Sequence, residues 1–314
     1  RLLSKDEAIS VYEYLDTVTQ QNLLRLLRSG EMQEVMEEMS PDDRARLFEE
    51  LPAKVVRQLL DQLSPEERKV TAELLGYEAE TAGRLMTTEY IALKENQTAL
   101  EALDIVRRRA RDTETIYSLY VTDNERRLTG ILSLRDLVTA DPHTFIRDVM
   151  TEEVLSVRTN TDQEKVARTI QRYDFLAVPV VDLEQRLVGI VTVDDVIDVI
   201  EQEATRDLYA AGAVQAGDED DYFSSNLFTV ARRRVVWLAV LVVASFFTSE
   251  VIAANEEVLQ KVVLLAAFIP LLGGTGGNVG AQSSTVVIRG LSTQSISAWG
   301  PLKAVGREAM AGAL

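Results

Sequence analysis

The residues with the most distinctive chemistry lie in a glycine-rich, polar segment within the uncharged stretch 262–288. A helix that faces lipid gains nothing from glycines and amides, which are tolerated where they face protein or line a water-filled cavity. Two interpretations stay open: close helix packing through small residues, and a pore whose carbonyl and amide oxygens replace part of an ion's water shell. The candidate pore-lining residues are Gly273, Gly274, Thr275, Gly276, Gly277, Asn278 and Gln282.

A second group is a run of acids on one predicted helix, residues 194–207. Asp194, Asp198 and Glu201 share a helical face, as do Glu203 and Asp207. Like charges at this spacing repel, and a solvated face is their usual explanation. A divalent cation is the alternative, because Mg²⁺ prefers a few carboxylate oxygens together with its own waters.

The composition excludes several classes of function. The 314 residues contain no Cys, one His and a net charge of −17. Disulfides, thiolate zinc sites and Cys nucleophiles are therefore excluded, and the acidity argues against nucleic-acid binding. Subtracting the 7 basic and 4 acidic residues found from Ala231 onward leaves 26 basic and 46 acidic residues before it, a net charge of −20. A strongly acidic part therefore precedes a weakly basic, apolar one.

Two segments of the apolar part, about 235–254 and 262–288, are long enough to span a bilayer. Buried core helices are the alternative. Two adjacent apolar stretches of this length argue against it. Basic residues flank the pair, whereas Glu256 and Glu257 lie between the spans. The positive-inside rule therefore predicts a hairpin, with residues 1–234 in the cytoplasm. The start of a third span follows, and we expect that both ends of the chain are cut.

The first 80 residues predict short stacked helices. Ser40-Pro41 and Ser64-Pro65 lie 24 residues apart, and each is followed by acids and an apolar periodic run. Serine at the N-cap, proline at the first helical position and acids in the first turn favour a helix start. A small helical superhelix and a simple bundle are both compatible with this pattern.

From residue 85 a duplicated unit of strands and helices begins. Leu85-Met-Thr recurs as Val149-Met-Thr, and residues 128–137 recur as 187–196, each after an apolar strand. The unit resembles the cystathionine-β-synthase (CBS) domain, with its Gly-hydrophobic-hydrophobic-Ser/Thr-x-x-Asp signature at 130–136 and again at 189–195. This resemblance implies one regulatory body that senses nucleotides or ions.

A hydroxyl and a carboxylate in that signature suit a ribose, so adenine nucleotide binding by Asp136, Thr192 and Asp195 is one hypothesis. The alternative is helix capping, because Ser133 and Thr192 each precede a predicted helix and have an acid three residues later.

The order of these parts resembles the MgtE family of magnesium channels and transporters, whose pore motif matches Ile269 to Ser283. The implied fold is multidomain: an all-α helical superhelix domain, an α/β tandem CBS pair, a connecting helix and an incomplete α-helical transmembrane region. The domains are 1–80, 81–147 (CBS 1), 148–204 (CBS 2), 205–234 (an amphipathic, plug-like connecting helix) and 235–314.

By local sequence context, the resemblance assigns magnesium sensing to Asp42, Asp162, Glu164, Asp174, Asp195, Asp198, Glu203 and Asp207. Arg206 stands where the family usually has an acid, as does Ser10. The positions that the family uses for adenine nucleotide are matched by Arg135, Asp136 and Phe175, which join Thr192 as the candidate nucleotide-binding residues. The ion-selecting aspartate of the family lies outside this chain.

The implied function is Mg²⁺ uptake across the cell (inner) membrane by a multi-pass homodimer, with Mg²⁺ both transported and regulatory, and ATP as a further ligand. We expect cytosolic Mg²⁺ to bridge acids and close the path as feedback. The rival hypothesis is a transporter controlled by adenine nucleotide, whose acidic patches only keep it soluble. An enzyme is the weakest option, because no nucleophile-base pair is visible.

Overall fold

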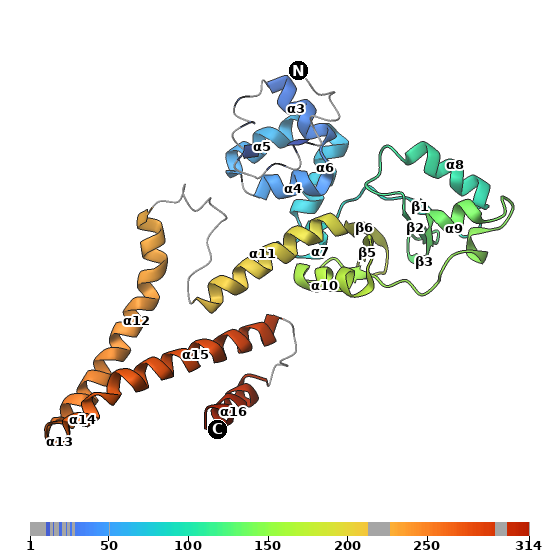
Figure 1. Ribbon diagram of the computed structural model, residues 1–314. Helices are drawn as coiled ribbons and strands as arrows, with labels where there is room; N and C mark the ends of the chain where they lie inside the picture. Colours follow the sequence, from blue (N-terminus) through green and yellow to red (C-terminus); the bar gives the residue numbers. More distant parts are fainter. Residues whose placement is uncertain are drawn as a thin grey trace. The chain divides into compact units, whose positions relative to one another are not determined.

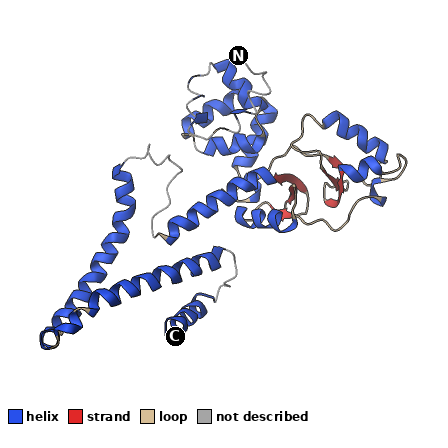
Figure 2. Ribbon diagram, in the orientation of Figure 1, coloured by secondary structure: helices blue, strands red, loops and turns tan. Residues whose placement is uncertain are grey.

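The computed structural model describes residues 29–49, 51–212, 227–292 and 300–313, with isolated positions between 11 and 26 (Figure 1). It forms two units, Arg1–Ile200 and Glu201–Leu314. Most of the described residues lie in helices, and the strands among them are confined to the CBS region of the first unit (Figure 2). Ser10, an expected departure from the family pattern, lies outside the described residues.

The first unit begins with a helical domain, in which two of the helices start at the predicted Ser-Pro pairs. Ser64 caps its helix by accepting a hydrogen bond from the Glu67 amide at 3.3 Å. A core that includes Met36, Leu47 and Leu59 lies between the helices. These are α3 (Ser29–Glu38), α4 (Pro41–Glu49), α5 (Ala53–Gln62) and α6 (Pro65–Leu75).

A fully buried guanidinium ties this domain together. Arg44 on α4 donates to Thr71 Oγ1 at 2.8 Å and to the Met36 carbonyl at 2.7 Å, and it forms an ion pair with Glu67. A buried cation is stable only when it is paired and hydrogen-bonded. Arg44 therefore fixes α4 against α6.

The two CBS modules repeat one topology. In each, a two-residue strand pairs in parallel with the middle strand, which pairs antiparallel with the third. In both modules a helix follows the first strand and another follows the third. The first module has α7 (Ala82–Leu85), β1 (Ala92–Leu93), α8 (Ala99–Arg109), β2 (Ser118–Thr122), β3 (Leu128–Ser133) and α9 (Leu134–Thr139). The second has η1 (Ile146–Asp148), β4 (Val157–Arg158), α10 (Gln163–Tyr173), β5 (Ala177–Val181), β6 (Leu187–Thr192) and α11 (Val193–Ala211).

The segment that precedes the first strand of each module, which we call its leading segment, packs against the third strand of the other module. A Cβ at Gly130 would meet the Met150 sulfur at 2.4 Å, and one at Gly189 would meet the Met86 sulfur at 2.6 Å. Thr87 likewise bridges to Ile190. The glycine of each signature is thus required where the leading segment of the other module crosses its strand.

The helical domain packs on the second module through an apolar seam. Ala45 and Leu74 of the helical domain are buried in one cluster with Val196 and Val199 of α11. This seam brings the acidic start of α4 to the acidic start of α11.

The second unit is a series of exposed helices. Two windows, 237–254 and 263–290, are apolar and long enough to cross a membrane, and neither is buried within the structure. Their length and composition agree with the predicted spans, although no membrane is present. The helices are α12 (Leu227–Ala254), α13 (Glu256–Lys261), α14 (Val263–Ala266), α15 (Phe268–Ser292) and α16 (Gly300–Ala313).

Two boundaries differ from the expectations. The predicted second span is divided at Ala267, three residues before Pro270, whose missing N–H is tolerated within the first turn of α15. The connecting helix expected at 205–234 is shared between α11 and α12, because Leu227 onward continues into the apolar run without a helix breaker. Residues 213–226 lie outside the described part of the chain.

Candidate functional site: an acidic junction on the second CBS module

Acids from four chain segments gather where α4 meets the start of α11. Burial, and next the charge of Asp42 on α4, raises the pKa of Asp195 on α11 and those of Glu89 and Glu114 from the first CBS module. We call this group the acidic junction and define it as Asp42, Asp43, Glu89, Glu114, Asp194, Asp195 and Asp198, with Arg46 among them.

Asp42 is the most buried acid of the junction. It is 7% exposed, and its Oδ1 is buried without a hydrogen-bond partner. Burial, with the neighbouring charge of Asp43, raises the pKa of Asp42 to about 6. Because most buried polar atoms are satisfied, this orphaned oxygen marks a place where a cation would be stabilised.

Arg46 is the cation already present in the junction. Its guanidinium forms an ion pair with Asp43 on the same helix and donates to Asp198 Oδ2 on α11 at 2.8 Å. Partial burial lowers the pKa of Arg46, but the charges of Asp43, Asp195 and Asp198 outweigh this and raise it. Arg46 therefore links the helical domain to α11.

Asp195 faces the same surroundings from the other side. Burial, and next the charge of Asp42, raises the pKa of Asp195 well above its ordinary value. Thr192 Oγ1 donates to its carboxylate at 2.9 Å. The hydroxyl and acid of the CBS signature are thus engaged with each other at the start of α11.

Glu89 and Glu114 are members that the sequence did not single out. Burial raises the pKa of Glu89 to about 7, with Asp42 and Glu67 adding to it, and the pKa of Glu114 is raised to about 8. Their backbones are joined, because the Glu114 amide donates to the Glu89 carbonyl at 2.9 Å. The position of Glu89, two residues after the repeated Leu-Met-Thr motif, is the only signal for it in the sequence.

The remaining predicted metal ligands lie elsewhere. Asp162 caps α10 by accepting from the Glu164 amide at 2.9 Å, and Glu164 pairs with Arg168. Asp174 ends the same helix with a positive φ of 53°. About 12 residues of helix separate Asp162 from Asp174, roughly 18 Å, so the two ends cannot share an ion.

Glu203 and Asp207 occupy the second half of α11. Glu203 forms an ion pair with Arg206 at 2.9 Å. Within the described ranges, no three carboxylate or imidazole groups are close enough together to hold one metal ion. The junction therefore offers oxygen donors that suit Mg²⁺ by chemistry, and they are spread over several elements.

The candidate nucleotide residues belong to both modules. Arg135 and Asp136 lie in α9, where Ser133 caps the helix by accepting from the Asp136 amide at 3.0 Å. Phe175 stacks on Tyr173 with ring centroids 5.5 Å apart, and Thr192 ends β6. The helix-capping interpretation of Ser133 is confirmed.

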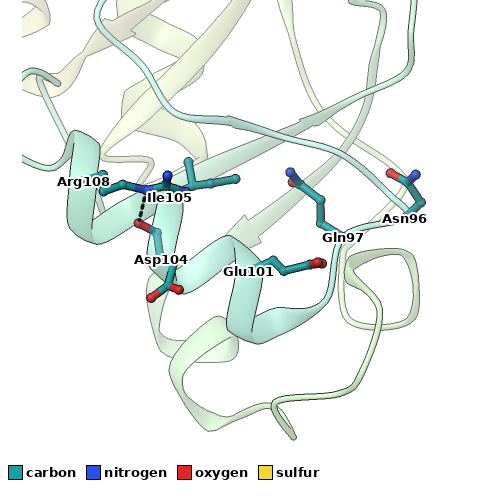
Figure 3. A pocket seen from close by; sticks show the side chains of 6 residues that line it. All are labelled: Asn96, Gln97, Glu101, Asp104, Ile105 and Arg108. Atoms are coloured by element: carbon teal, nitrogen blue, oxygen red, sulfur yellow. Dashed lines mark hydrogen bonds between the residues drawn. The ribbon is translucent and has the colours of Figure 1, made fainter.

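A polar cavity of about 390 Å³ opens beside the start of α8 (Figure 3). Arg108 Nε donates to the Asp104 carbonyl at 3.2 Å at one end of it. It contains none of the predicted site residues. Its lining is Asn96, Gln97, Glu101, Asp104, Ile105 and Arg108.

The candidate pore residues all lie on α15. Ser283, one residue beyond Gln282, donates to Glu308 of α16 at 2.6 Å. A carboxylate is thus held against the polar end of the glycine-rich segment.

Comparison with protein families gives three matches along the chain. Residues 1–80 match the MgtE intracellular N domain, residues 82–143 and 146–202 match the CBS domain, and residues 269–314 match a divalent cation transporter family.

Curated relatives extend this similarity. The chain is 45% identical to the magnesium transporter MgtE of Thermus thermophilus over 71% of its own length and 49% of that protein. It is 37% identical to the Bacillus subtilis magnesium transporter MgtE over 83% of the chain and 57% of that protein. The chain thus spans about half the length of the curated relatives it matches.

Two solved structures resemble the first part of the chain. One is the cytosolic domain of the Mg²⁺ channel MgtE in complex with ATP, at 48% identity and a TM-score of 0.60, covering 63% of this chain and 81% of that one. The other is the soluble part of a magnesium transporter, at 42% identity and a TM-score of 0.62, covering 64% and 80%.

Proposed function

The chain belongs to the MgtE family, and we propose that it is part of a membrane transporter that admits Mg²⁺ and is closed by cytosolic Mg²⁺. The buried, unpartnered Oδ1 of Asp42 at the acidic junction is the observation that carries this proposal. Residues 1–234 would face the cytoplasm of a cell-membrane homodimer. The named relatives are magnesium transporters, which supports the choice of ion.

The junction supplies the sensing chemistry. Regulatory Mg²⁺ would bind with its own waters at separate carboxylates of the junction, those of Asp42, Asp195 and Asp198, between the helical domain and α11. The ions would supply the charge that the crowded carboxylates require. Desolvation disfavours the carboxylate at Asp42. A divalent ion reverses this cost and stabilises the packed arrangement of the seam.

The other predicted sensor residues would add weaker sites. Each site stabilises the metal-bound arrangement by RT ln(1 + [Mg²⁺]/Kd), about 1.4 kcal/mol at ten times Kd. Six sites would supply about 8 kcal/mol, more than the roughly 5.5 kcal/mol that moves a two-state equilibrium from 1:99 to 99:1. Several weak sites therefore suffice for steep closure. The additional residues are Asp162, Glu164, Asp174, Glu203 and Asp207.

The membrane part would carry the ion. Backbone and amide oxygens of the glycine-rich segment of α15 suit a partly hydrated cation. The polar Ser283–Glu308 contact beside this segment supports a path along this helix.

ATP is a second ligand that a specific observation favours. A structure of a relative's cytosolic domain holds ATP, and Arg135, Asp136, Phe175 and Thr192 offer charge, hydroxyl and aromatic groups for it. Control by nucleotide alone, with purely solubilising acids, remains the rival function.

Growth of cells that lack their own Mg²⁺ uptake tests the transport proposal. The protein that contains this chain should restore growth in low Mg²⁺, and Asn278→Leu should abolish the rescue while leaving the protein in the membrane. Growth that is not restored by a membrane-inserted wild-type protein contradicts Mg²⁺ uptake. Measured ATP binding that alters uptake at fixed Mg²⁺ would favour the rival.

A further inference from the structure

Arg46 lies in the acidic junction and forms ion pairs with acids of both α4 and α11. It forms one ion pair with Asp43 within α4. It forms a second, across 152 residues of sequence, with Asp198 of α11. The contact with Asp198 connects the helical domain to the helix that leads out of the second CBS module.

The electrostatic surroundings explain why a cation belongs at this point. The guanidinium lies among the charges of Asp43, Asp195 and Asp198, while the seam of Ala45 and Leu74 holds the helical domain against α11. Without a positive charge, the seam would bring these carboxylates together against their mutual repulsion. Arg46 offsets that repulsion from within the chain.

We propose that Arg46 is a resident cation that holds the helical domain on α11 when Mg²⁺ is scarce and shares its carboxylates with Mg²⁺ when the ion is abundant. This inference rests on the proposed Mg²⁺-sensing function. Arg46 would set the fraction of molecules in which the helical domain is docked on α11 before any metal binds. It would thereby set the range of Mg²⁺ concentration over which docking responds.

The size of the effect follows from exposure. The Arg46 and Asp198 side chains are 41% and 64% exposed, and ion pairs at such exposure are individually weak. We therefore expect removal of the pair to lower the docked-to-undocked ratio roughly twofold to fivefold. Added Mg²⁺ should restore it, because the carboxylates that Arg46 leaves are free for the ion.

Spin-label distances measure docking directly, because the chain contains no Cys and two introduced ones are unique. Labels at Lys54→Cys on α5 and Glu184→Cys on the second CBS module, both exposed positions, report the separation of the two parts. The 314-residue chain in nanodiscs is measured with chelator and then with 10 mM MgCl₂, at constant ionic strength and at a salt concentration where both distances are populated.

Arg46→Gln should lose docked population in chelator and regain it in Mg²⁺. Asp198→Asn should show the same loss in chelator, and the double variant should lose no more than either alone. Arg107→Gln is the matched control, because Arg107 makes an exposed ion pair to Asp104 within a single helix, and it should behave as the wild type.

An Arg46→Gln variant that docks like the wild type in chelator overturns the proposal, as does one that undocks and is not restored by Mg²⁺. The proposed function is judged separately, from whether the wild-type distances respond to Mg²⁺. Wild-type distances that do not change with Mg²⁺ would contradict the proposed Mg²⁺ sensing. The comparison of wild type with Arg46→Gln in chelator would still decide whether Arg46 holds the helical domain on α11.

Discussion

Arg46 of the helical domain donates a 2.8 Å hydrogen bond to Asp198, 152 residues further along the chain. This pair places a positive charge inside the acidic junction, where burial, together with the charges of neighbouring acids, raises the pKa of Asp42 and of Glu89. The surroundings of the junction therefore disfavour the charged form of these carboxylates. An added cation would stabilise the packing of the helical domain on α11.

Neutralising Asp42 should separate intrinsic stability from the response to metal. A rise in pKa from 3.8 to about 6 corresponds to about 3 kcal/mol of destabilisation at pH 8. Asp42→Asn should therefore raise the urea midpoint in chelator and lose most of the increase that Mg²⁺ gives the wild type. Asp61→Asn, at an exposed position, is the control. A variant that is destabilised in chelator yet still stabilised by Mg²⁺ contradicts the assignment.

The stability of the junction should depend on pH in a defined direction. The pKa of Glu89 is raised from 4.5 to about 7, so the folded form binds more protons than the unfolded form in that interval. Stability is then fully present below about pH 4.5 and is lost as pH rises through 7. In chelator we expect the melting temperature to fall by roughly 5 °C between pH 5 and pH 8.

Glu89→Gln should reduce this slope, whereas exposed Glu184→Gln should not. A melting temperature that rises over the same interval would show that Glu89 is not a protonated group in the folded protein. Circular dichroism of the chain in detergent micelles provides the measurement.

The buried guanidinium of Arg44 should be essential to the helical domain. Arg44→Met removes a cation that is 0% exposed and leaves Glu67 unpaired, a change that typically costs 3–5 kcal/mol. Hydrogen exchange in α4 and α6 should accelerate by about two orders of magnitude or more. Exchange in the CBS strands should change little, and equal acceleration in both regions would contradict a role confined to this domain.

The two signature glycines should differ in their tolerance of a methyl group. At Gly189 a Cβ meets the Thr87 carbonyl oxygen at 2.7 Å, a backbone atom, whereas at Gly130 the three nearest atoms all belong to the Met150 side chain. Methionine side chains adapt readily, so Gly189→Ala should destabilise by about 1–3 kcal/mol more than Gly130→Ala. Urea unfolding compares them, and equal costs would mean that the Thr87 backbone shifts freely.

Local signals explain which features the sequence predicted. Ser-Pro pairs start α4 and α6, the duplicated signature gives two sheets of the same topology, and long apolar runs give α12 and α15. Each of these features depends on residues that are close together in the chain, because helix capping, periodicity and hydropathy are local properties of the sequence.

The acidic junction depended on contacts that local patterns do not encode. Asp42 looks like an exposed acid in the first turn of a helix, yet the seam around Ala45 buries it. Arg46 looks like a partner for Asp43 alone, and its bond to Asp198 requires the tertiary fold. Glu89 carries no sequence signal beyond its neighbouring motif.

The central claim is that Mg²⁺ stabilises the packing of the helical domain on the second CBS module through the acidic junction. Hydrogen exchange in α4 and α11 of the 314-residue chain, measured across a Mg²⁺ titration with K⁺ holding ionic strength fixed, tests it most directly. Exchange should slow in both helices at millimolar Mg²⁺, and Asp42→Asn combined with Asp195→Asn should remove the effect. Exchange rates that stay constant in the wild type across the titration would contradict it.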